Sequence, residues 1–182
     1  MSTLLLHICC GPCAAPVIER LKGAYDLTGF FYNPNIHPLD EYLRRLEAAK
    51  TVAEQFKIPL IEGVYEPNVF FDIVRGLEDE PENGERCQVC YRLRLSKTVS
   101  AAAKGSFNAI ASTLTTGTMK KASIINPIGK EESACAGIQF VSYDWKKKDG
   151  FKRSCELSRE YGIYRQNYCG CLFSMRNTGH KK

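Results

Sequence analysis

Apolar residues recur along the chain with two different periods, and their alternation predicts strands separated by helices. Short apolar runs that are typical of buried strands occupy residues 4–8, 26–32, 59–61, 108–112 and 138–142. Helical spacing is clearest from Leu39 to Phe56, where charged residues fill the positions between the apolar ones. Further helices are expected over 13–21, 68–75, 88–103 and 151–161, with a helical connection between 118 and 135. This order predicts an α/β fold, a parallel sheet with helices on both faces.

Length and composition favour a single domain, which we expect to span residues 1–182. Hydrophobic residues make up 44% and charged residues 25%, a balance that is too even for a disordered chain. No apolar run approaches the roughly 20 residues that a membrane span needs. The first six residues also lack the basic start of a signal peptide. We therefore expect a cytoplasmic protein that does not bind membranes.

The net charge of +5 is distributed unevenly. From Trp145 to Lys182 there are ten Lys and Arg against three Asp and Glu, or +7, so the first 144 residues carry −2. A basic C-terminal segment, about 145–182, suggests a polyanionic partner such as nucleic acid. A solvated helix face is the alternative interpretation.

A cysteine-rich turn, His7-Ile8-Cys9-Cys10-Gly11-Pro12-Cys13, follows the first predicted strand. Ligands of parallel α/β folds bind beyond the carboxyl ends of the strands, where this turn is expected to lie. In a reducing compartment, clustered cysteines more often indicate metal binding or redox chemistry than a disulfide framework. Neighbouring Cα atoms are ~3.8 Å apart, less than the usual disulfide range of about 4.4–6.8 Å. Cys9 and Cys10 are therefore interpreted as metal ligands or a reactive pair.

A second pair, Cys87 and Cys90, has the CxxC spacing that metal sites share with thioredoxin-like sites. It lacks the strand that precedes a thioredoxin CxxC. Together with Cys9 and Cys10 it provides four thiolates, which suit either zinc or an iron–sulfur cluster. A structural zinc knuckle is the alternative, but one pair follows the first strand of a full-sized domain, which favours iron–sulfur.

A third pair, Cys169 and Cys171, flanks Gly170. Glycine provides the backbone freedom that a small, strained disulfide ring needs, and a strained disulfide is easily reduced. The pair is therefore predicted to be a two-electron redox couple, with extra metal ligands as the alternative. Cys135 and Cys155 stand alone and are expected to be structural.

The three motifs together resemble QueH-type epoxyqueuosine reductase, namely His7–Cys13, Cys87–Arg94 and Tyr164–Cys171. The resemblance implies an iron–sulfur enzyme that reduces the epoxide of epoxyqueuosine, at the wobble position of tRNA, to the alkene of queuosine. It also implies a fold similar to the Rossmann-like adenine-nucleotide α-hydrolase superfamily. By this resemblance a [4Fe–4S] cluster is held by Cys9, Cys10, Cys87 and Cys90, and Cys169 and Cys171 form a redox-active disulfide.

One departure from that superfamily concerns ATP. Its pyrophosphatases carry a Ser-Gly-Gly-x-Asp-Ser phosphate loop where this chain has Cys-Cys-Gly-Pro-Cys, and Pro12 removes a backbone donor. This argues against the second candidate, an ATP-using tRNA-thiolating enzyme of the same fold. A zinc-stabilised RNA-binding module is the third candidate.

Epoxide reduction needs two electrons and two protons, whereas a cluster passes one electron at a time. A cysteine pair or a second iron would solve this, with an external electron donor supplying the electrons. Cys13 lies one helical turn from Cys9 and Cys10 and could hold such a metal, which could polarise the epoxide C–O bond. His7 and Asp144 are weaker candidates, and a hydrogen-bonded core histidine is the favoured alternative for His7.

The basic segment would then bind the partner, a tRNA that carries epoxyqueuosine. Its cations could neutralise anticodon phosphates, and its aromatic rings could stack on unpaired bases. The candidates are Lys146, Lys147, Lys148, Lys152, Arg153 and Arg165 for phosphate, and Trp145, Phe151, Tyr164 and Tyr168 for stacking. Tyr164 or Tyr168 could also donate a proton.

Overall fold

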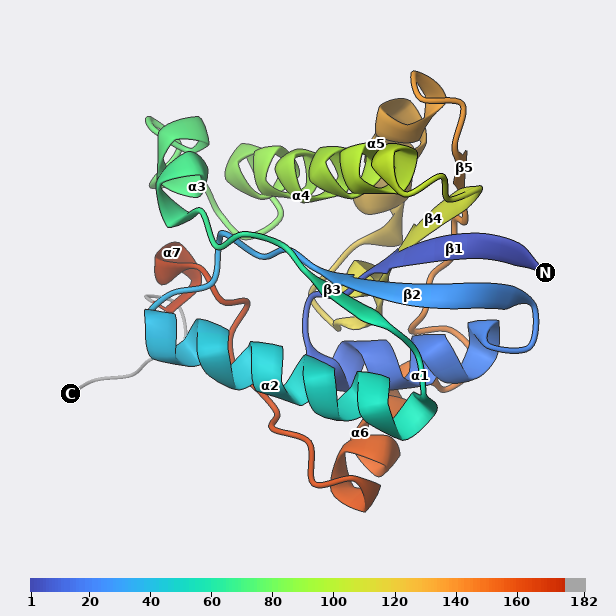
Figure 1. Cartoon of the computed structure of the whole chain (residues 1–182). Helices are drawn as coiled ribbons and strands as arrows, with labels where there is room; N and C mark the ends of the chain where they lie inside the picture. Colours follow the sequence, from blue (N-terminus) through green and yellow to red (C-terminus); the bar gives the residue numbers. More distant parts are fainter. Residues whose placement is uncertain (176–182) are drawn as a thin grey trace.

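The computed structural model describes residues 1–175, and its centre is a five-stranded parallel sheet (Figure 1). The strands are ordered β3-β2-β1-β4-β5, and every neighbouring pair runs parallel. Their bounds are β1 Ser2–His7, β2 Tyr25–Phe31, β3 Leu60–Glu62, β4 Ala109–Ser112 and β5 Gln139–Phe140. On β1, Leu4 pairs with Leu27 of β2 and with Ala109 of β4.

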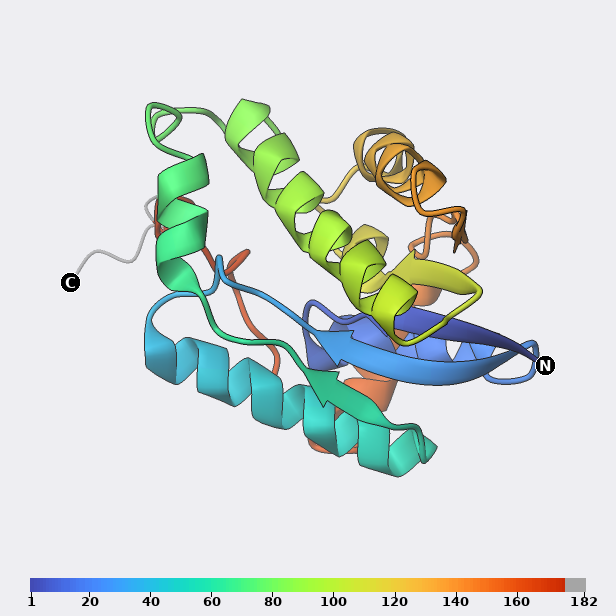
Figure 2. The same ribbon diagram turned by 45° about the horizontal axis from the view of Figure 1, so that its top comes forward.

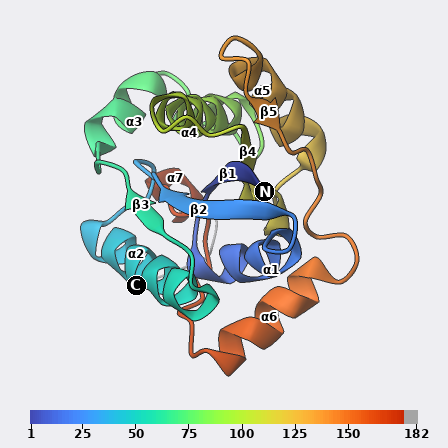
Figure 3. The ribbon, with the colours of Figure 1, turned by 45° about the vertical axis from the view of Figure 1, so that its right-hand side comes forward.

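Helices cover both faces of this sheet, which confirms the predicted fold class (Figure 3). Helices α1 (Gly11–Leu21), α2 (Leu39–Phe56) and α6 (Gly150–Glu160) form one layer. Helices α4 (Glu85–Lys104) and α5 (Ala122–Ala134) form the other and run across the opposite face (Figure 2). Shorter elements complete the described chain, namely α3 (Pro67–Ile73), the 3-10 helix η1 (Thr113–Thr116) and α7 (Leu172–Met175).

Strand β1 is buried on both sides, as a central strand of a parallel sheet requires. Leu4 and Leu6 belong to the core cluster that packs between the sheet and α1 and α2. Leu5 points to the other side, where it shares a cluster with Val99 and Ala102 of α4. The continuous apolar run at the start of the chain is the sequence signature of this position.

Gly11 lets α1 begin against α2. A Cβ atom at this position would lie 2.6 Å from the carbonyl oxygen of Ala48, a contact that no side chain tolerates. Pro12 occupies the first turn of the helix, where its missing N–H costs nothing. The end of the cysteine-rich turn therefore packs closely against α2.

The carboxyl ends of β1 and β4 form the switch point of the sheet. The chain leaves β1 through α1 toward one face, and it leaves β4 through η1 and α5 toward the other. The backbone N–H of Cys9 donates a hydrogen bond to Thr113 Oγ1 over 3.0 Å, and Thr116 Oγ1 donates to the carbonyl oxygen of Cys13. Open α/β sheets bind their ligands at such a point.

Candidate functional site

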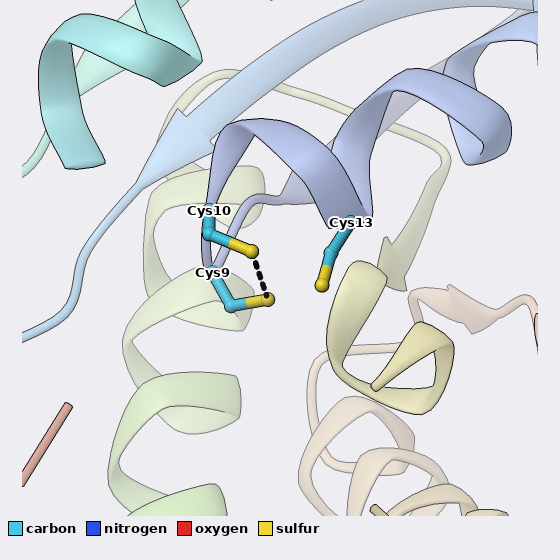
Figure 4. A group of neighbouring side chains, drawn as sticks. All are labelled: Cys9, Cys10 and Cys13. Atoms are coloured by element: carbon cyan, nitrogen blue, oxygen red, sulfur yellow. Dashed lines mark hydrogen bonds between the residues drawn. The ribbon is translucent and has the colours of Figure 1, made fainter. Parts of the chain in front are cut away.

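Three cysteine sulfurs gather at the switch point (Figure 4). Cys9 and Cys10 lie in the turn after β1, Cys13 lies in the first turn of α1, and the three Sγ atoms are within 4.8 Å of one another. The Sγ atoms of Cys9 and Cys10 are 3.7 Å apart. Two thiolates on one tetrahedral ion, with metal–sulfur bonds of ~2.3 Å, would be separated by roughly 3.8 Å. This group can therefore bind a metal, and Cys13 belongs to it as the sequence suggested.

The CxxC pair lies nearby, at the start of α4. Cys87 and Cys90 are buried one helical turn apart. Cys9 packs against the apolar cluster that contains Cys87, and Cys90 shares a cluster with Cys171. Within residues 1–175, neither CxxC sulfur joins the tight group of three. The cysteines of a [4Fe–4S] cluster each bind a different iron, so its ligands are more widely spaced than those of one ion.

The CxC pair follows α6 and lies against the same region. Cys169 is partly buried and lines a cavity together with Cys9, Cys10 and Cys13, whereas Cys171 is buried. Both are free thiols here. Gly170 has a φ of +121°, a conformation that strains any residue with a side chain. The backbone between the two thiols therefore adopts a conformation that glycine tolerates, as the sequence led us to expect.

Arg45 of α2 holds this segment in place. Its Nε donates to Glu41 Oε1 over 2.7 Å, and its two other nitrogens donate to the carbonyl oxygens of Cys169 and Tyr168, over 2.9 and 3.1 Å. The guanidinium also lies 5.0 Å from the centre of the Tyr168 ring. The planar fork of arginine suits such multiple contacts.

Arg45 is one of four cations that line the cavity, and the others are Arg94, Lys120 and Arg165. Arg94 is only 3% exposed, donates to Asn33 Oδ1 over 2.6 Å, and has no carboxylate partner in the described part of the chain. A buried cation requires compensating negative charge. An all-thiolate metal centre provides that charge, so the cations fit such a group. The donor set is all sulfur, which favours iron–sulfur clusters or zinc over hard cations.

The electrostatics of the triad single out one thiolate. Hydrogen bonds from Cys10 and Cys13 lower the pKa of Cys9 well below its usual value, with Arg94 adding to the effect. Burial raises the pKa of Cys10 to about 12, and hydrogen bonds to Cys10 and Cys9 raise that of Cys13. Burial likewise raises the pKa of Cys90 to about 12. Cys9 is thus the thiol whose ionisation the other two favour, and a bound metal would replace their protons.

His7 is a core histidine rather than a free ligand. It is fully buried, its Nε2 donates to the carbonyl oxygen of Tyr32, and its Nδ1 lies 3.0 Å from Ser112 Oγ. Burial lowers its pKa to about 3, which keeps the ring neutral. Asp144, the other weak metal candidate, forms an ion pair with Lys146 and lines a separate groove.

The two candidate proton donors are engaged within the protein. Tyr164 Oη donates to Glu41 Oε2 over 2.8 Å, and Tyr168 Oη donates to the carbonyl oxygen of His37. Burial raises the pKa of Tyr168 to about 12. Both tyrosines therefore position the segment that carries the CxC pair.

The cavity has a volume of about 370 Å³, which suits one nucleoside better than a larger part of an RNA. Two amide side chains on its wall keep acceptors without a partner. Asn35 is 1% exposed, and its Oδ1 accepts no hydrogen bond from residues 1–175. Gln166 donates from Nε2 to Cys10 Sγ over 2.9 Å, while its Oε1 has no partner in the same part of the chain. Gln166 lies within the third motif, where it was given no role, and Asn35 was not singled out by the sequence, since an isolated amide carries no pattern.

Half of the cations proposed for phosphate binding have internal roles. Lys146 Nζ donates to the carbonyl oxygens of Thr115 and Lys120, Arg153 pairs with Glu19 and Glu156, and Arg165 bonds Ser154 and Ser158. Lys147, Lys148 and Lys152 are exposed and form no ion pair within the described residues. Of the remaining cations of the segment, Arg159 is exposed in the last turn of α6, and Arg176, Lys181 and Lys182 lie outside the described residues.

The aromatic residues of this segment divide in the same way. Trp145 is 4% exposed and donates from Nε1 to the carbonyl oxygen of Ser112, so it belongs to the core and is not placed to stack on a base. Phe151 and Tyr164 are more than one-third exposed. An open groove of about 860 Å³, lined by Lys130 and Lys147 among others, adjoins the thiol cavity, because Thr118 and Lys120 line both.

The family of the chain follows from comparison with known proteins. The family model described as "Epoxyqueuosine reductase QueH" matches residues 4–177. The chain belongs to the epoxyqueuosine reductase QueH family. It is therefore an oxidoreductase of queuosine biosynthesis, and the resemblance seen in the three cysteine motifs is confirmed.

Relatives with this name occur in distant bacteria. The chain is 39% identical to that of Streptococcus pyogenes, with 97% of this chain and 72% of the relative covered. It is 39% identical to the Acinetobacter baylyi protein, over 96% and 81% of the two chains. It is 36% identical to the Thermotoga maritima protein, with 100% of this chain and 94% of the relative covered.

Among solved structures, a predicted subunit of tRNA methyltransferase from Methanocaldococcus jannaschii has a similar fold. Its TM-score is 0.56 at 13% identity, and the match covers 88% of this chain and 75% of that one. At this identity the likeness extends to the α/β fold alone. No helix in residues 1–175 combines the length and apolarity needed to cross a membrane.

Proposed function

We propose that this QueH-family protein is an iron–sulfur reductase that converts epoxyqueuosine to queuosine at the wobble position of tRNA, acting as a single domain in the cytoplasm. The observation that carries the proposal is that Cys9, Cys10, Cys13 and Cys169 line one cavity at the switch point of the sheet, while Cys87 and Cys90 pack in the apolar clusters that Cys9 and Cys171 contact. Four cations line that cavity, as a negatively charged thiolate centre requires.

The proposed ligands of a [4Fe–4S] cluster are Cys9, Cys10, Cys87 and Cys90. These residues would hold the cluster, which would pass electrons one at a time from the external donor toward the cysteine pair. Cys13 lies within 4.8 Å of two of these sulfurs and is the proposed ligand of a second iron. The charge of Arg94 adds to the lowering of the pKa of Cys9 and offsets part of the rise that burial causes in the pKa of Cys90, which supports an anionic centre between the two motifs.

Cys169 and Cys171 are proposed to store the two electrons of the reaction. As their S–S bond forms, the two thiols release two electrons and two protons. The epoxide accepts both, its two C–O bonds break, and the products are an alkene and one water molecule. An external electron donor then returns the disulfide to two thiols. Arg45 supports this role, because it fixes the backbone of Cys169 beside the cavity.

The protein's own groups would orient the substrate. The unpaired acceptors Asn35 Oδ1 and Gln166 Oε1 can receive hydrogen bonds from the hydroxyl or amino groups of a nucleoside. A buried acceptor that finds no partner costs about 1–3 kcal/mol, so these two atoms discriminate against ligands without matching donors. Exposed Lys147, Lys148 and Lys152, with Phe151, are the proposed contacts to the tRNA anticodon arm.

The alternatives predict different products and metals. A tRNA-thiolating enzyme would need ATP, and membership of a reductase family favours reduction instead. A zinc centre would give a colourless protein, whereas an iron–sulfur protein is brown and absorbs near ~400 nm.

The activity is tested with anaerobically purified protein, a reductant and tRNA that carries epoxyqueuosine. Digestion of the tRNA and mass spectrometry of its nucleosides should show a product lighter by one oxygen atom. Cys169→Ser and Cys171→Ser should keep iron and sulfide but lose turnover. Loss of the cluster in both variants would make these cysteines ligands, and full activity in both would remove the pair from the reaction.

A further inference from the structure

A basic groove lies beside the thiol cavity, between the first turns of α5 and the chain that follows β5. Its volume is about 860 Å³, and Thr118 and Lys120 line both the groove and the cavity. The charged residues on its walls are five lysines and one aspartate, namely Lys120, Lys121, Lys130, Lys146, Lys147 and Asp144. The groove is therefore positively charged, and the proposed reaction assigns no role to its α5 side.

Two lysines on the α5 side are available to bind an anion. Lys121, the residue before α5, and Lys130, within it, are exposed and form no ion pair in residues 1–175. The carboxylates of Glu131 and Glu132 both pair with Arg92 of α4, so they do not neutralise the lysine beside them. Both ammonium groups therefore keep their charge for a ligand.

The rest of the groove also favours a negatively charged ligand. The carboxylate of Asp144, on its wall, pairs with Lys146 Nζ at 3.2 Å. Within the described chain no side chain caps the start of α5, where Ala122 and Ser123 line the groove. The N–H groups of an uncapped helix start attract anions. This adds to the attraction that the exposed lysines provide.

The groove offers charge but no free ring on which a base could stack. Among the described residues, Tyr143 is the aromatic residue that lines it, and its ring packs against that of Trp145, with the ring centres 4.6 Å apart. Recognition of single-stranded bases relies on exposed aromatic side chains. Lysine contacts go to phosphates, which carry no sequence information. The groove is therefore suited to a nucleic-acid backbone.

We propose that this groove binds the phosphodiester backbone of the RNA strand that continues from the nucleoside in the thiol cavity, with Lys121 and Lys130 as its phosphate contacts. The cavity suits one nucleoside, so the next nucleotides of the strand lie outside it, and the wall shared through Thr118 and Lys120 leads them into the groove. The inference rests on the proposed function and deepens it, because it places the strand beside the reacting nucleoside. Both lysines precede the basic C-terminal segment.

The test measures how the metal-loaded protein binds tRNA that carries epoxyqueuosine at several salt concentrations. Lys121→Gln with Lys130→Gln should weaken binding and flatten the slope of log affinity against log salt by about 1.4, since each single-strand contact contributes roughly 0.7. Lys121→Arg with Lys130→Arg keeps both charges and should keep the slope. Lys22→Gln with Lys104→Gln, which removes exposed lysines from the C-terminal ends of α1 and α4, should bind like the parent protein.

A second comparison uses tRNAs that differ in the nucleotides beside the modified one. The loss of affinity in the double Gln variant of Lys121 and Lys130 should be uniform across them, because phosphate contacts are independent of sequence. A loss that is confined to one neighbouring sequence would mean that the groove reads bases, which overturns the inference.

Kinetics and metal content separate this inference from the proposed function. In the double Gln variant of Lys121 and Lys130, KM for tRNA should rise while kcat, iron and sulfide stay unchanged, as expected for lost uniform binding. A slope equal to that of the Lys22 and Lys104 control would overturn the role of the groove and leave the reaction intact. A parent protein that binds the tRNA but does not remove the oxygen would overturn the reaction alone. If the parent does not bind this tRNA, both fall.

Discussion

Buried polar side chains decide how the thiol cavity is built. His7 was a possible metal ligand in the sequence, because it precedes the cysteine motif. The structure gives both of its nitrogens a protein partner, Ser112 and Tyr32, and keeps the ring neutral. Arg94 belongs to the second cysteine motif, but Arg45 and Lys120 were not foreseen. These two come from segments distant from the cysteines in sequence, so only the fold brings their charges to the cavity.

The structural role of His7 can be tested by substitution. His7→Leu should lower the free energy of unfolding by about 1–3 kcal/mol, because the buried carbonyl oxygen of Tyr32 then loses the hydrogen bond from His7. His7→Gln keeps a donor and an acceptor and should cost less. Urea unfolding of both variants measures the difference. A His7→Gln protein with normal stability but reduced iron would instead make His7 a ligand.

Among the helices and strands, those with strong patterns were predicted best. The helix from Leu39 to Phe56 has the predicted bounds, because its apolar face packs on the sheet over its whole length. The last strand was expected to have five residues and has two, since only β4 lies beside it. Elements η1 and α7 have four residues each, too few to show a period. The cysteine motifs lie far apart in sequence, and they come close together through tertiary contacts that no local sequence pattern predicts.

The contact between α1 and α2 supports a prediction about the glycine of the cysteine motif. Gly11→Ala should destabilise the protein by about 1–3 kcal/mol, because its Cβ would overlap the backbone of Ala48. Gly23→Ala is the control, since its Cβ would meet no atom within 4 Å. Thermal or urea unfolding of the two variants makes the comparison. Similar stability for both would contradict the close approach of the helices.

At the scale of the whole molecule, the exposed Lys147 lines a groove that adjoins the thiol cavity. Helices that follow parallel strands return toward the amino ends of those strands, so the cavity lies at the opposite end from the C-termini of α1, α2 and α4. The sequence located the basic segment, but it could not tell which of its charges are used internally. Lys146, Arg153 and Arg165 stabilise the fold, and this leaves Lys147, Lys148 and Lys152 for a polyanion.

Binding of tRNA should therefore depend on those three lysines. Changing Lys147, Lys148 and Lys152 together to Gln should weaken binding and flatten its salt dependence, since each lost phosphate contact lowers the slope by about 0.7–0.9. The matched control changes Lys22, Lys57 and Lys104, exposed lysines at the far ends of α1, α2 and α4. Titration at several salt concentrations gives both slopes. Equal slopes for the two triple variants would place the tRNA elsewhere.

The central claim is that four cysteines from two distant motifs hold an iron–sulfur cluster while the CxC pair stays outside it. The most direct measurement is the iron and acid-labile sulfide content, with the visible spectrum, of anaerobically purified protein and its single Cys variants. Replacement of Cys9, Cys10, Cys87 or Cys90 by Ala should lower both contents and bleach the band near ~400 nm. Cys169→Ser and Cys171→Ser should leave them unchanged. A full cluster in all four Ala variants, or zinc in place of iron in the parent protein, would contradict the account.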